Sequence, residues 1–107
     1  MGAGRSAPSG IGPVGMLRQI VEDAAVTEEI DLACEVAPRL REAWEGLTWL
    51  LARTPEIGHR LGLGESIRVH KQQGLYRQHL PAITVLYDYT ETTVFLRSVR
   101  FTYLYDI

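Results

Sequence analysis

The chain has 107 residues and a net charge of −2, with 46% hydrophobic and 22% charged residues. These values describe one ordinary globular domain that buries its own core. The single cysteine, Cys34, excludes an internal disulfide, and no apolar run approaches the ~20 residues of a membrane-spanning helix. We therefore expect a cytoplasmic protein that makes no membrane contact.

Residues 1–15 are predicted to form a flexible leader, because they hold five of the ten glycines and two of the five prolines. A single domain is expected over residues 16–107. Its first segment, 16–22, is ambiguous: Leu17, Val21 and Ala24 have helical spacing, whereas Ile20 and Val21 favour a strand. We interpret this segment as an edge strand.

Two helices separated by a proline are predicted between residues 27 and 53. Thr27 is suited to cap the first helix, with acidic residues in its first turn. Pro38 would cost about 3 kcal/mol inside a helix but little in a first turn, so we expect it to open the second helix. That helix carries an apolar stripe formed by Leu40, Ala43, Trp44, Leu47, Leu50 and Leu51.

A glycine-containing loop is predicted over residues 55–64, and alternation then indicates a half-exposed strand over residues 66–72. Residues 75–80 could extend the next strand, with Pro81 marking a bulge or an edge position. Residues 82–89 and 94–101 form a hairpin of two central strands. Ile83, Val85 and Tyr87 share one face, and Val94, Leu96 and Ser98 alternate with Phe95, Arg97, Val99 and Phe101.

These elements predict an α+β fold, in which two helices cover one face of an antiparallel sheet of about four strands. The charge is divided unevenly along the chain. Residues 1–49 carry −4, from four arginines and eight acidic residues, whereas residues 50–107 carry +2. The C-terminal half is therefore either a mixed solvated surface or a face that binds phosphate groups.

The chain resembles the RelE/ParE superfamily of toxin-antitoxin toxins. The resemblance rests on APRLREAWEGLTWLL at 37–51, TPEIG at 54–58, Arg68, and ITVLYDYTETTVFLRSV at 83–99. It implies either a ribosome-dependent RNase that cuts messenger RNA or a non-enzymatic inhibitor of DNA gyrase. In both cases an antitoxin protein would neutralise the toxin, and no cofactor or metal is implied. A third hypothesis is an interaction module that keeps the fold without the toxicity.

Cleavage of RNA by its own 2′-hydroxyl needs a base, an acid and cations that stabilise the charged transition state. The resemblance places such groups on the sheet and at its C-terminal end. Lys71, Arg97 and Tyr105 are also available, but our candidate catalytic residues are Arg68, His70, Arg77, His79, Arg100 and Tyr103. We expect this set on the sheet face away from the helices, with Arg68 and His70 projecting from the same side of one strand.

Two features depart from the family pattern. A basic residue is expected at the position of Thr84 or Ala82, and neither is basic. The sequence pI of about 5.9 is also low for a protein that enters a ribosome. The charge therefore accords better with a protein that binds gyrase or with a toxin that has lost its activity.

Overall fold

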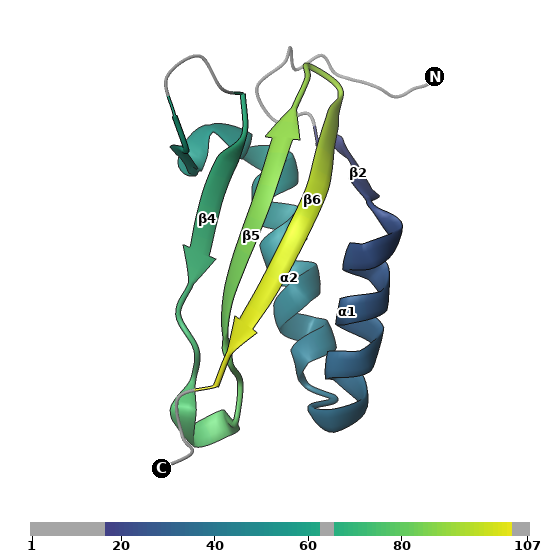
Figure 1. The fold of residues 1–107 in the computed structure, drawn as a ribbon, viewed down its shortest axis with the longest axis vertical. Coiled ribbons are helices and arrows are strands. Elements are labelled where there is room, and N and C mark those ends of the chain that lie inside the picture. Colours follow the sequence, from purple (N-terminus) through teal and green to yellow (C-terminus); the bar gives the residue numbers. More distant parts are fainter. Residues whose placement is uncertain (1–16, 63–65, 104–107) are drawn as a thin grey trace, which may run out of the picture.

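Two helices lie against one face of a five-stranded sheet in the computed structural model, which describes residues 17–62 and 66–103 (Figure 1). The predicted leader, residues 1–15, and Tyr105 lie outside the described residues. The elements in chain order are β2 (Gln19–Glu22), α1 (Ala24–Val36), α2 (Leu40–Arg53), η1 (Pro55–Ile57), β3 (His59–Arg60), β4 (Arg68–Gln72), η2 (Tyr76–Gln78), β5 (Ala82–Tyr89) and β6 (Thr93–Thr102). The predicted α+β fold is confirmed.

The sheet has the strand order β2-β6-β5-β4-β3. β2 pairs in parallel with β6, and the other neighbours are antiparallel. β5 and β6 are central, as predicted from two apolar runs. The edge strand predicted over residues 16–22 is confirmed for Gln19–Glu22, residues 17 and 18 are not in a strand, and residue 16 lies outside the described residues. The fifth strand, β3, lies within the predicted loop, and its two residues are too few to produce a detectable alternation.

The core lies between the helices and one face of β5 and β6. Its fully or almost fully buried side chains are Val26, Ile30, Leu40, Trp44, Leu47, Leu51, Ile83, Val85, Tyr87, Val94 and Leu96. The stripe of α2 supplies four of these residues, so the prediction that this helix covers the hairpin is confirmed. We call the opposite side of the sheet, which neither helix covers, the open face (Figure 1).

Helix α1 begins three residues earlier than its predicted cap. Asp23 occupies the N-cap position, and the backbone N–H of Thr27 donates to the Asp23 carbonyl oxygen at 3.1 Å. The Thr27 hydroxyl instead donates to Glu22 Oε1 at 2.7 Å. Capping by Thr27 was therefore wrong, because β2 ends directly before the helix and the side chain of Thr27 binds the end of that strand.

The junction between the helices follows the prediction more closely. Pro38 lies in a turn two residues before α2 begins at Leu40, and α2 ends at Arg53, before Thr54-Pro55. Trp44 is buried, and its Nε1 donates to Glu22 Oε2 at 2.9 Å. This bond ties the centre of α2 to the edge strand. Within the described residues, neither helix is long and apolar enough to cross a membrane.

A β-bulge at Arg97 changes which residues of β6 face the core. Leu96 pairs with Tyr87 and Ser98 pairs with Leu86, so Arg97 is an extra residue in the ladder. Strict alternation predicts that Ser98 shares the face of Leu96 and that Val99 lies on the opposite face. That assignment was wrong, because one inserted residue reverses the alternation beyond it.

The segment before Pro81 does not extend β5. Leu75 and Leu80 form an isolated bridge that encloses the short helix η2. The chain reverses there at His79, whose φ of 57° is in the left-handed region. This turn explains why β5 begins only at Ala82.

Candidate functional site

Arg68 and His70 project from the same side of β4, as predicted, but that side faces the helices. Arg68 pairs with Tyr87 and His70 pairs with Val85, and both partners belong to the core. Directly paired residues share a face. The expectation that Arg68 and His70 lie on the open face was therefore wrong, because two-residue spacing fixes their common side but not which side it is.

Arg68 is held by the loop that follows α2. Its Nη1 donates to the carbonyl oxygens of Gly58 at 2.7 Å and of Glu56 at 3.2 Å. The half-buried guanidinium also lies 5.7 Å from the centroid of the Tyr89 ring. Arg68 thus joins β4 to the η1–β3 segment in addition to supplying a positive charge.

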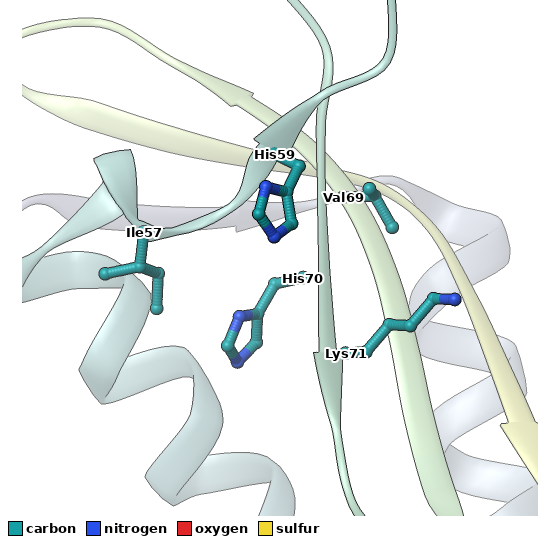
Figure 2. Close-up of a pocket in the computed structure, with 5 residues that line it drawn as sticks. All are labelled: Ile57, His59, Val69, His70 and Lys71. Atoms are coloured by element: carbon teal, nitrogen blue, oxygen red, sulfur yellow. The ribbon is translucent and has the colours of Figure 1, made fainter.

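A pocket opens where the short strand β3 ends alongside β4. Its lining residues are Ile57, His59, Val69, His70 and Lys71, which we call the edge pocket (Figure 2). β3 pairs only with Arg68 and Val69, so it leaves the remainder of the β4 edge open. Figure 2 shows the rings of His59 and His70 between Ile57 of η1 and β4, with Val69 and Lys71 on the other side of the strand.

The environment of His70 favours its neutral form. Burial lowers the pKa of His70 below its ordinary value of 6.5, and the charge of His59 lowers it further. A neutral imidazole at pH 7 can accept a proton. The edge pocket therefore combines a proton acceptor, a second imidazole and an ammonium group.

Arg100 is the predicted residue that lies on the open face as expected. It pairs with Thr84, which in turn pairs with Lys71 on β4. These three residues form one row across the sheet. Thr84, where the family pattern expects a basic residue, consequently has a cation on each side.

The other three predicted residues lie near the opposite end of β4. Arg77 is exposed in η2, and His79 lines a small separate pocket with Val36, Arg39 and Leu80. Tyr103 follows β6 and lines a groove beside α1 together with Arg100, the second predicted residue there. The six predicted residues therefore occupy three regions and do not form one site.

Two residues of the edge pocket were not among the candidates. Lys71 is available in the sequence but is outside the candidate set, and His59 lies in the segment predicted to be a loop. The TPEIG motif ends directly before His59, which is the one sequence signal that places this histidine near the strand carrying Arg68. No sequence pattern indicated that β3 would bring His59 beside His70.

Among the described residues, no three His, Cys, Asp or Glu side chains gather as potential metal ligands. Comparison of the chain with protein-family models, with curated proteins and with solved structures finds no match.

Proposed function

We propose that this protein is a RelE/ParE-like toxin that cleaves RNA in the edge pocket without a metal ion. The observation that carries the proposal is the presence of two imidazoles and an ammonium group in one pocket at an open strand edge. The two imidazoles supply a base and an acid, which are the proton-transfer groups that cleavage by a neighbouring 2′-hydroxyl requires, and the ammonium group adds positive charge near the pocket.

His70 acts as the base in this mechanism, because its lowered pKa keeps it neutral. It takes the proton from the 2′-hydroxyl, whose oxygen attacks the adjacent phosphorus. The bond from phosphorus to the 5′-oxygen breaks, and His59 gives a proton to that oxygen. The products are a 2′,3′-cyclic phosphate and a free 5′-hydroxyl.

The order of elements supports the toxin assignment. One strand, two helices and, after the two-residue β3, three antiparallel strands follow one another in the order that the resemblance implies. Lys71 and Arg100 on either side of Thr84 also partly replace the missing basic residue of the family pattern. In this proposal the toxin acts in the cytoplasm on messenger RNA at the ribosome, and an antitoxin protein neutralises it.

The test is cleavage of a defined messenger RNA by the purified protein in the presence of translating ribosomes. We expect His70→Gln and His59→Gln each to lower the cleavage rate by ~10²-fold or more, because each removes a proton-transfer group. The matched control is His79→Asn, since His79 lies in another pocket and asparagine tolerates a positive φ. Its rate should stay within about twofold of wild type.

The same assay between pH 5 and 8 tests the role given to His70. The wild-type rate should fall as the pH decreases through the pKa of His70, below 6.5, because protonation removes the base. This acidic decline should be absent in His70→Gln. If folded wild-type protein cleaves no RNA beside translating ribosomes, the enzyme proposal is wrong, and binding to DNA gyrase becomes the better explanation of the toxin-like fold.

A further inference from the structure

Two arginines approach the same tyrosine ring where β5 ends. The guanidinium carbon of Arg18 lies 5.5 Å from the centroid of the Tyr89 ring, and that of Arg68 lies 5.7 Å from it. Arg18 directly precedes β2, whereas Arg68 is the first residue of β4. In the sheet, β2 and β4 lie on opposite sides of the central pair β6–β5, so the two cations come from opposite flanks of that pair. We call these three residues the arginine–tyrosine cluster.

Protein groups hold both guanidiniums in position. Arg18 Nε donates to the carbonyl oxygen of Thr90 at 2.9 Å, and Arg68 Nη1 donates to that of Gly58. The aromatic face adds a cation–π attraction. The two side chains are therefore placed before any ligand binds.

Within the part of the chain that the structure describes, no ion pair neutralises these two charges. In residues 17–62 and 66–103, ion pairs form between Arg41 and Asp31 and between Arg97 and the carboxylates of Asp23 and Asp88. No carboxylate of the described residues pairs with Arg18 or Arg68. Two like charges near one ring repel each other, and a bound anion would remove that repulsion.

A third cation lies beside the cluster. Arg60 pairs directly with Arg68 across β3 and β4, so both project from the same side, and Arg60 is exposed. Two acidic residues lie near the cluster in the chain: Glu56 contributes its backbone carbonyl to Arg68, and Glu91 follows Thr90, whose carbonyl binds Arg18. Positive charge therefore predominates in this region.

The cluster adjoins the edge pocket. Arg68 and His70 are two residues apart on the same side of β4, a spacing of roughly 6.6 Å along a strand. Gly58, whose carbonyl binds Arg68, lies between Ile57 and His59 of the pocket wall. A strand of RNA bound in the pocket would thus pass the cluster within one or two nucleotides.

We propose that the arginine–tyrosine cluster binds a phosphate group, and that in the working protein this is the phosphate of the nucleotide next to the cleaved one. Guanidinium groups match the geometry of phosphate oxygens, and two of them can contact one phosphodiester. The identification of the ligand as single-stranded RNA rests on the proposed function. The existence of the phosphate site rests on the geometry alone.

The test measures binding of a fluorescent 2′-O-methyl oligoribonucleotide, which cannot be cleaved, by anisotropy over a range of salt concentrations. Arg18→Gln should weaken binding about tenfold and reduce the slope of log K against log salt by about 0.7, as expected for one lost phosphate contact. Arg18→Lys keeps the charge and should recover most of the affinity. Arg39→Gln, which removes an exposed arginine far from the cluster, is the matched control and should bind like wild type.

Thermal unfolding of each variant separates a lost contact from a lost fold. Unchanged affinity and salt slope in folded Arg18→Gln would overturn the phosphate site, whatever the cleavage assay gives. If Arg18→Gln weakens binding but wild type cleaves no RNA, the phosphate site stands and the proposed function falls. Inorganic pyrophosphate should compete only at millimolar concentration, and displacement at far lower concentration would overturn RNA as the source of the phosphate.

Discussion

The hydroxyl of Tyr87 connects the sheet to the wall of the edge pocket. It donates to the Pro55 carbonyl oxygen at 2.6 Å and accepts a bond from the Gly58 N–H at 2.9 Å. Burial raises the pKa of Tyr87, so the hydroxyl keeps the proton that it donates. A side chain on Gly58 would collide with this hydroxyl and lie 2.8 Å from the Val69 carbonyl oxygen. Position 58 therefore requires a glycine, because its backbone lies so close to Tyr87 and Val69.

We expect Tyr87→Phe to lower the free energy of unfolding by about 1 to 3 kcal/mol. The variant leaves the Gly58 N–H and the Pro55 carbonyl buried without their partner. Urea denaturation followed by tryptophan fluorescence measures the change. Tyr89→Phe is the control, because no hydrogen bond from the Tyr89 hydroxyl is found among the described residues. Equal losses in both variants would show that the Tyr87 hydroxyl has no special role.

At the scale of elements, the bulge in β6 determines which side chains reach the core. Arg97, the extra residue, is exposed, and its Nε lies 2.9 Å from Asp88 Oδ1. Below it, Val99 pairs with Val85 and Phe101 with Ile83 on the helix side. Removing the extra residue would join Leu96 and Ser98 in one regular ladder without changing the partner of either.

Deletion of Arg97 should therefore preserve the fold, with a free energy of unfolding within about 1 kcal/mol of wild type. The deletion removes only the ion pairs of Arg97 with Asp23 and Asp88, and exposed ion pairs contribute little to the free energy of unfolding. Deletion of Phe95 is the control, since it would place Leu96 opposite Asp88 and direct Arg97 toward the core. Denaturation curves should show a folded protein for the deletion of Arg97 but not for the deletion of Phe95. Unfolding of both would mean that the bulge itself is required.

The elements that the sequence predicted are those with a strong local period. Alternating β-branched and aromatic residues identified β5 and β6, and a 3.6-residue stripe identified α2. Local pattern could not locate β3 or the bulge, because both depend on how strands pair. The same limit explains the site: Arg68 and His70 were correctly placed on one side of β4, but only the pairing with Tyr87 and Val85 reveals which side.

At the scale of the whole molecule, most exposed carboxylates of the described residues lie on the two helices, although α2 also carries the exposed Arg41 and Arg53. The helices carry exposed carboxylates at Glu28, Glu29, Asp31, Glu35, Glu42 and Glu45. The edge pocket and the arginine–tyrosine cluster involve the sheet and its connecting segments. A net charge of −2 therefore coexists with the arginines of the arginine–tyrosine cluster, and the low pI of the whole chain does not describe the charge of that region.

Charge reversal on α2 tests this separation. Glu42→Lys combined with Glu45→Lys should leave cleavage and oligonucleotide binding within about threefold of wild type, because neither carboxylate approaches the bound phosphate in our proposal. The cleavage and anisotropy assays described above provide the measurement. Loss of either activity in a stable, folded double variant would identify the acidic surface of α2 as part of the working surface.

The parallel pairing of β2 with β6 also affects how the protein folds during its synthesis. Gln19 pairs with Thr93, and the bond from Arg18 to Thr90 joins residues 72 positions apart. Such distant contacts close a long loop and slow folding. Until β6 leaves the ribosome, β2 lacks its partner, and α1 and α2 lack much of the surface that they cover. We therefore expect the nascent chain to keep part of the apolar surface of both helices exposed until β6 has been made.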